Sequence, residues 1–143
     1  MRRFMLAAAL AALGAAVLAT PAVAFDHHFT VVAKPRSSHG VGRNAFVFKD
    51  RLFDPHSRHD KVGSDRGKCR QKHGGPKTKC RIRVHLNGEI GGFGDIRVKG
   101  DLDSGPDHFV VIGGSDDFDG VAGKLTEHTV SERIAKYRFD LIR

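Results

Sequence analysis

Long apolar runs and helical periodicity are both missing from this chain beyond residue 24. Without a run of about 20 apolar residues, no later segment is expected to cross a bilayer as a helix. Without apolar residues at every third or fourth position, no amphipathic helix is expected either. A Walker loop, a dinucleotide fingerprint and a nucleophile elbow are also missing, which argues against the nucleotide-binding and hydrolase classes that depend on them. Order in this chain therefore has to come from strands.

The first 24 residues have the pattern of a cleaved export signal. Arg2 and Arg3 precede an uncharged run over 5–20, Pro21 breaks that run, and 22–24 reads Ala-Val-Ala. An N-terminal membrane anchor is the alternative, but the run is shorter than the roughly 20 residues a span needs. We expect a signal peptide at 1–24, a secreted (extracellular or periplasmic) domain at 25–143, and no membrane span after cleavage.

Charge is unevenly distributed along a basic chain whose formal net charge is +8. From 49 to 83, twelve Lys and Arg residues stand against four Asp and Glu, whereas from 101 to 143 five stand against nine. Such a distribution can orient a protein against a polyanion or a neighbouring copy, or simply keep it in solution. The basic stretches lack interleaved aromatic residues, which together with export argues against a nucleic-acid partner.

The two cysteines, Cys69 and Cys80, lie at equal distances from the Gly74–Gly75 pair. Gly-Gly favours the positive φ angles of a tight hairpin, so a hairpin centred there would place the cysteines directly opposite each other. Directly opposed residues on antiparallel strands share a face and are close enough to bridge. Because export leads to an oxidising compartment, we predict a Cys69–Cys80 disulfide, with free thiols as the alternative.

Period-two alternation recurs along 25–143 and is clearest in 79–86, where every second residue is apolar. Eight segments, separated by Gly, Pro, Asp or Asn, are predicted strands: 28–34, 44–53, 67–72, 79–86, 95–99, 108–113, 121–130 and 135–141. The polar stretches 56–68 and 72–79 are expected to be loops. Strands with one apolar face and no helix to cover it must close or form a sandwich. We predict an all-β domain, an eight-stranded antiparallel up-and-down β-barrel.

Three stretches resemble motifs of one protein superfamily. Residues 62–69 have the form V-G-x-x-x-G-x-C, residues 113–123 are similar to G-G-[ST]-G-x-[FY]-x-G-x-x-G, and residues 48–53 look like F-T-[ND]-x-L-Y. They follow one another in order between about residue 42 and residue 143. The chain therefore resembles the allene oxide cyclase and dirigent protein superfamily, in its bacterial secreted form. The resemblance implies an eight-stranded barrel, commonly a homotrimer, that acts on small, largely apolar molecules in its interior.

The second of these stretches is the corner motif of the superfamily. Its glycines would supply backbone freedom at a tight corner between strands, and its aromatic residue can plug a barrel end. We assign to this structural motif Gly113, Gly114, Phe118, Gly120 and Gly123.

The catalytic sets of the superfamily are only partly present. The resemblance aligns Asp50 with the inward Asn of plant cyclases and Cys69 with their cysteine, but the first strand has no Glu. Dirigent proteins carry an Arg where this chain has Ala122, and only Asp26 lies near the place of their first-strand Asp. Neither activity is supported by a complete set.

Asp50 is the candidate catalytic residue, because the alternation in 44–53 places it on the apolar face of its strand. In a lumen, desolvation would raise its pKa and make it a plausible general acid or base. The alternative is a structural carboxylate at the barrel mouth, held by an Arg or by backbone amides. The candidate ligand-binding residues of the lumen are Phe46, Phe48, Leu52, Glu127 and Tyr137. No metal or cofactor is expected, since His56 and His59 lack a third fixed ligand.

Three functions remain open at this point. The favoured one is a secreted dirigent- or allene-oxide-cyclase-like barrel that binds and orients a small hydrophobic or phenolic molecule in its lumen. The second is an isomerase or cyclase in which Asp50 transfers a proton or stabilises charge. The third is a non-catalytic structural protein that binds an anionic cell-surface partner. Fold alone does not decide among them.

Overall fold

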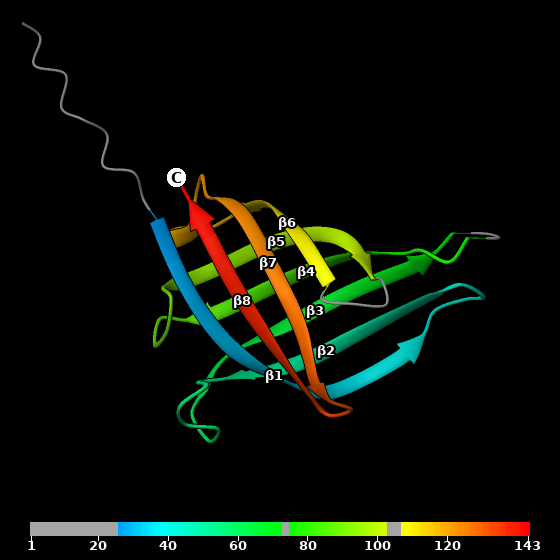
Figure 1. Ribbon diagram of the computed structural model, residues 1–143, viewed down its shortest axis with the longest axis horizontal. Helices are drawn as coiled ribbons and strands as arrows, with labels where there is room; N and C mark the ends of the chain where they lie inside the picture. Colours follow the sequence, from blue (N-terminus) through cyan, green and yellow to red (C-terminus); the bar gives the residue numbers. More distant parts are fainter. Residues whose placement is uncertain (1–25, 73–74, 103–106) are drawn as a thin grey trace, which may run out of the picture.

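Eight strands and one short helix make up the part of the chain that the computed structural model describes, residues 26–72, 75–102 and 107–143 (Figure 1). The expected signal peptide at 1–24 lies outside these residues. Along β4, apolar side chains are buried and the charged ones between them are exposed, as the alternation predicts. The elements are β1 Asp26–Gly40, β2 Ala45–Phe53, β3 Lys61–Gln71, β4 Thr78–Asn87, β5 Phe93–Leu102, β6 Asp107–Gly114, the 3₁₀ helix η1 Asp116–Phe118, β7 Ala122–Ser131 and β8 Ile134–Ile142.

Each strand pairs antiparallel with the next, and β8 pairs with β1, so the sheet closes on itself. At the closure Asp26 lies opposite Ile142 and Ala33 lies opposite Ala135. Closure hides one face of all eight strands without a covering helix. The predicted eight-stranded antiparallel up-and-down barrel is confirmed. Within the described residues, no helix is both long and apolar enough to cross a membrane.

The end of the barrel at which β1 begins, β8 ends and η1 lies is closed by aromatic side chains. Phe29 stacks on Phe139 with ring centroids 4.7 Å apart and lies 6.3 Å from the ring of Phe118, which is fully buried. Gly91 has a φ of +74°, and a Cβ there would come within 2.8 Å of the Phe29 ring. A larger residue at this position would both strain the backbone and push the plug aside.

The opposite end carries the hairpins β1–β2, β3–β4, β5–β6 and β7–β8, and its inward side chains are less buried. Phe46, Phe48, Leu102 and Ala135 pack against the core but are only partly covered. We call this the open end of the barrel. The inward side chains at this end are therefore more exposed than those of the aromatic plug.

Strand β3 begins earlier than predicted, because residues 61–66 form strand and not loop. Its inward positions include Gly63, Asp65 and Gly67, so it shows no apolar alternation. The glycines are needed for space: a Cβ on Gly67 would lie 2.1 Å from the ring of Phe48, and one on Gly63 would lie 2.1 Å from the His85 carbonyl oxygen. Because close packing requires glycine at these inward positions, β3 lacks the alternating apolar residues on which the strand prediction relied.

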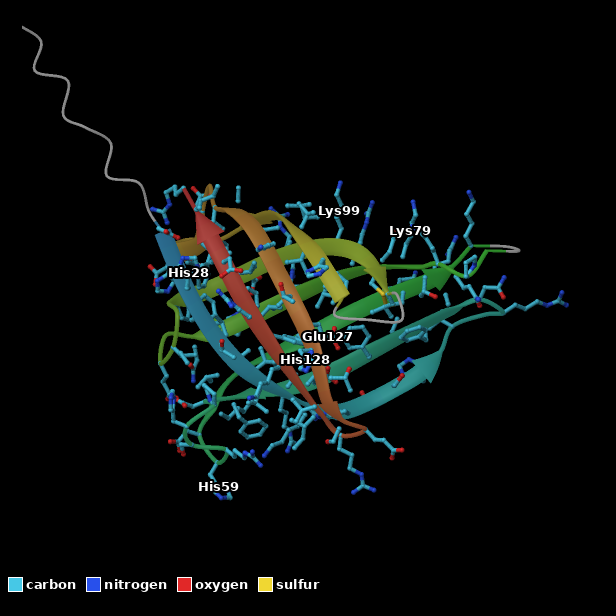
Figure 2. The ribbon with its side chains drawn as sticks, in the orientation of Figure 1. His28, His59, Lys79, Lys99, Glu127 and His128 are labelled. Atoms are coloured by element: carbon cyan, nitrogen blue, oxygen red, sulfur yellow. A yellow bond between two sulfur atoms is a disulfide. The ribbon has the colours of Figure 1, made fainter. Side chains whose placement is uncertain are left out.

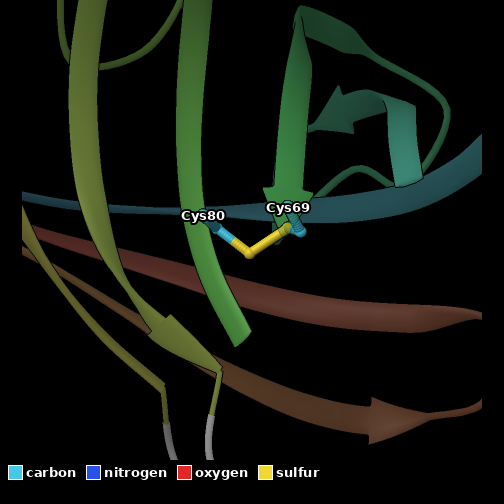
Figure 3. The surroundings of a disulfide bond; sticks show 2 residues. All are labelled: Cys69 and Cys80. Atoms are coloured by element: carbon cyan, nitrogen blue, oxygen red, sulfur yellow. A yellow bond between two sulfur atoms is a disulfide. The ribbon is translucent and has the colours of Figure 1, made fainter. Parts of the chain in front are cut away.

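The predicted disulfide between Cys69 and Cys80 is confirmed (Figure 3). The two residues are directly opposed on β3 and β4, with Cα atoms 4.1 Å apart. The described residues contain no other cysteine, and both sulfur-bearing side chains are buried. The alternative of a free Cys69 thiol is therefore wrong for this structure.

Candidate functional site

Asp50 lies on the inner face of β2, as the alternation predicts. A bulge in β1 between Pro35 and Ser37 faces it, and the backbone amide of Arg36 donates a hydrogen bond to its carboxylate. The Tyr137 hydroxyl donates to its Oδ2 atom at 3.4 Å. Burial raises the pKa of Asp50 by desolvation, and the two hydrogen bonds oppose that rise. Both open interpretations thus have support: the carboxylate is held by an amide, and it faces the interior.

Asp65, on β3 directly opposite Asp50, completes a carboxyl pair that the sequence pattern did not identify. Its side chain is only 4% exposed. The Asp50 amide donates to its Oδ1 atom at 3.1 Å. Its Oδ2 atom accepts no hydrogen bond of good geometry among the described residues, although the Tyr137 hydroxyl lies near enough to the carboxyl to lower its pKa. Desolvation, reinforced by the nearby charge of Asp50, raises the pKa of Asp65 to about 7. Near neutral pH this group therefore exchanges between acid and carboxylate.

Tyr137 and Glu127 approach the carboxyl pair from the opposite strands. They are paired across β7 and β8, and Tyr137 is buried with 1% exposure. Desolvation raises the pKa of Tyr137 well above its usual value, and the charges of Asp65, Glu127 and Asp50 add to the rise. Glu127 is half-buried, and its charge also raises the pKa of Asp65. Figure 2 places Glu127 on the long β7–β8 pair.

These four side chains, which we call the acidic cluster, are Asp50, Asp65, Glu127 and Tyr137. The described residues include no buried Lys or Arg to balance them. Nor do they contain a group of three or more His, Cys, Asp or Glu side chains able to hold a metal. An uncompensated buried carboxyl keeps its proton instead of gaining a counterion. The cluster can therefore donate and accept hydrogen bonds, and can exchange a proton, without a metal ligand set.

The other residues predicted for the site occupy two zones. Phe46 and Phe48 lie at the open end, whereas Leu52 is fully buried beside the core. In the corner motif, Phe118 belongs to the aromatic plug at the closed end. Gly113 and Gly123 have φ angles of +141° and +134°, which explains glycine at both positions. The corner motif thus lies away from the acidic cluster.

The inward position of Asp65 could have been predicted from its two-residue spacing in the sequence, which a count of apolar residues alone ignores. Counting back by twos from Cys69 through Gly67 reaches Asp65 and then Gly63, and all four are inward. If glycine is counted as compatible with an inward position, the alternation of β3 extends back to Gly63. The prediction failed because a glycine adds no apolar side chain to the pattern.

Comparison with known proteins agrees on the architecture. No protein-family model and no curated protein sequence matches the chain. Among solved structures, a pyocyanin demethylase superposes with a TM-score of 0.64 at 22% identity, covering 80% of this chain and 98% of its own. A pterocarpan synthase dirigent protein gives 0.69 at 13% identity, covering 87% and 94%. The exo-specific intermolecular Diels-Alderase AbnU gives 0.57 at 18% identity, covering 81% and 98%. The chain has the same barrel fold as these three proteins, one of which is a dirigent protein.

Proposed function

We propose that this barrel binds a small hydrophobic or phenolic molecule through its open end and orients it against the acidic cluster. The observation that carries the proposal is the Oδ2 atom of Asp65, a buried acceptor in the acidic cluster to which no described residue donates a hydrogen bond of good geometry. A buried polar atom without a partner is costly, and a ligand hydroxyl or a protonated nitrogen would remove that cost. A phenolic group has both the donor and the apolar ring that such a site fits.

The surroundings of the cluster suit the same ligand class. Phe46 and Phe48 lie at the open end with ring centroids 6.3 Å apart and provide apolar surface next to Asp50. Pockets for small molecules are mostly apolar, with a few polar groups that fix orientation. The structural neighbours are named as a demethylase, a pterocarpan synthase and a Diels-Alderase, all of which point to small organic molecules.

An isomerase or cyclase is the second candidate, favoured by the raised pKa values of the carboxyl pair. One carboxyl can accept a proton from the bound molecule while the other, kept protonated, returns one elsewhere on it. Asp65, with a pKa of about 7, suits the role of acid, and Asp50 that of base. Such an isomerisation needs no reagent beyond the two side chains and the substrate.

The single tyrosine gives a direct test of binding, because the only Tyr ring signals of the protein belong to Tyr137. With ring-labelled tyrosine, addition of 2-naphthol is expected to shift these NMR signals saturably, and Asp65→Asn to weaken the effect. The matched control is Asp54→Asn, which alters a carboxyl near the surface of the β2–β3 loop. An unshifted Tyr137 across a panel of phenols, and no ligand retained by protein from its source in native mass spectrometry, would contradict the proposal.

The same variants separate binding from catalysis. If the barrel only orients its ligand, Asp50→Asn and Asp65→Asn should change the affinity for that ligand. The kinds of product formed from the bound molecule should stay the same. If it is an isomerase, both variants should bind and fail to turn over. The proposal also includes export of the protein and its assembly as a homotrimer. Light scattering of the purified domain 25–143 measures its oligomeric state.

A further inference from the structure

On the outer face of β2–β5, Lys and Arg side chains line up in three rows. The rows form because pairing of the strands brings these residues opposite one another. Directly opposed residues across neighbouring strands form each row. We call this surface the basic face; its rows are Lys49–Arg66–Arg83–Arg97, Lys68–Arg81–Lys99 and Arg70–Lys79.

All nine side chains of the basic face are exposed. Figure 2 shows Lys79 and Lys99 projecting away from the barrel on β4 and β5. Among the described residues, only Arg83 of the nine lies within ion-pair distance of a carboxylate, with its Nε atom 3.6 Å from Asp95 Oδ2. Like charges directly opposite each other on neighbouring strands destabilise a sheet. A surface that keeps so many such pairs unneutralised has the charge expected of a binding site for an anion.

Two hollows run across the strands between these rows. One, of about 1010 Å³, has Cys80 and Gly100 on its floor, with the Lys68–Arg81–Lys99 row along one side and Arg70–Lys79 along the other. The second, of about 650 Å³, lies between the Lys68–Arg81 and Lys49–Arg66–Arg83–Arg97 rows. Asp101 is the one acidic residue lining either hollow. Neither is lined by a residue of the acidic cluster.

We propose that the basic face binds a linear acidic polysaccharide, laid across the strands in these hollows. Along each row the cations stand one strand spacing apart, about 4.8 Å, which suits a polymer that repeats its charges at regular intervals. The rows are about 7 Å apart, so a polymer lying in a hollow has cations on both sides. The arginines offer planar forks for carboxylate or sulfate groups. The one Phe, Tyr or Trp ring that lines either hollow is that of Phe48, which faces the barrel interior, so neither hollow presents an exposed Phe, Tyr or Trp platform of the kind that single-stranded nucleic acid uses. An exported protein, as residues 1–24 predict, meets such glycans.

Calorimetric titration of the domain with heparin and alginate oligosaccharides tests the proposal, with neutral dextran as the blank. The face variant Lys68→Gln, Arg81→Gln and Lys99→Gln removes the middle row, of which Lys68 and Arg81 line both hollows. It is expected to weaken binding by roughly tenfold or more and to flatten the dependence of log affinity on log salt.

The matched control carries Arg58→Gln, Arg133→Gln and Lys136→Gln, three exposed cations on the β2–β3 loop, the β7–β8 turn and β8. It has the same net charge as the face variant and is expected to lose less than about threefold in affinity. Equal losses in the two variants would overturn the site, because net charge alone would then explain binding. Tighter binding of duplex DNA or of phosphatidylglycerol vesicles than of either acidic glycan would overturn the partner. Thermal melts confirm that both variants fold.

Discussion

A carboxyl group enclosed in a barrel without a balancing cation holds its proton, and Asp65 is in that position. Its pKa of about 7 makes it neutral over most of the acidic range and charged only above neutrality. Asp50 is partly covered, and its pKa is raised for the same reason, desolvation. The chemistry of the interior is therefore set by burial, since the described residues place no basic side chain beside the pair.

Replacing Asp65 with Asn is expected to stabilise the protein above pH 7. The folded state binds a proton at Asp65 up to about pH 7, whereas the ordinary value is 3.8, so between these values the folded state holds more protons than the unfolded state. Wild-type stability should then fall as pH rises through this window and level off above it. An amide has no such dependence, so the variant should gain about 2–4 kcal/mol at pH 8, and progressively less toward pH 4.

Urea denaturation at several pH values, followed by Tyr137 fluorescence, measures this gain. The control is Asp54→Asn: its carboxylate accepts hydrogen bonds from the His56 and Ser57 amides, which lower its pKa, so the substitution should not stabilise. Wild-type stability that rises between pH 5 and pH 7 would show that Asp65 is not the group that takes up the proton.

Sequence alone identified three of the four members of the acidic cluster. Asp50, Glu127 and Tyr137 each stand in a strand whose apolar neighbours reveal the inward face. Asp65 stands between Gly63 and Gly67, which leave no such trace. Its pairing with Asp50 further depends on the β2–β3 register. The connection between these strands, residues 54–60, is not a short turn whose sequence would have fixed that register.

At the scale of strands and hairpins, local patterns predicted most of the fold. Four segments, 44–53, 79–86, 95–99 and 135–141, alternate between an apolar and a more polar face, and closure follows from the need to hide the apolar faces of eight strands. The start of β3 was wrong because its inner face is built of glycine and aspartate. The β3–β4 register was predictable because two cysteines flank a glycine pair symmetrically, although residues 73–74 lie outside the described part of the chain.

Removing the cross-link is expected to cost about 2–4 kcal/mol of stability, because the bond restricts the unfolded chain. Cys69 and Cys80 are separated by 11 residues and join β3 to β4 near the open end. The double variant Cys69→Ala, Cys80→Ala avoids burying a new hydroxyl. Its urea midpoint should be lower than that of the oxidised wild type and close to that of the reduced wild type. A reducing agent that also shifts the variant would show an effect unrelated to this bond.

At the scale of the whole molecule, the barrel separates an acidic interior from a basic exterior. The alternation that turns Asp65 inward turns its neighbours Arg66 and Ser64 outward, so one strand serves both surfaces. The sequence indicated the excess of cations in 49–83 but not their rows. The rows need the registers of β2–β3, β3–β4 and β4–β5 together, which only the closed sheet provides.

The rows should make the stability of the molecule depend on salt. Each directly opposed like-charge pair costs roughly 0.2–1 kcal/mol, and ions screen such exposed pairs. The urea midpoint of the wild type is therefore expected to rise between about 20 mM and about 500 mM NaCl. Lys68→Gln, Arg81→Gln and Lys99→Gln together abolish the Lys68–Arg81 and Arg81–Lys99 pairs. This variant should gain about 1 kcal/mol at low salt and show a smaller salt response than the wild type, because the opposed pairs of the other two rows remain.

A heparin oligosaccharide distinguishes a binding site from general screening. A ligand that binds only the folded state stabilises it in proportion to its occupancy. Heparin should therefore raise the melting temperature of the wild type more than NaCl does at equal ionic strength, and should do little for the face variant. Equal effects of heparin and NaCl on the wild type would mean that the rows are merely repulsive. A face variant less stable than the wild type at low salt would mean that the cations stabilise the sheet through contacts, which would leave no like-charge repulsion for an anionic partner to relieve.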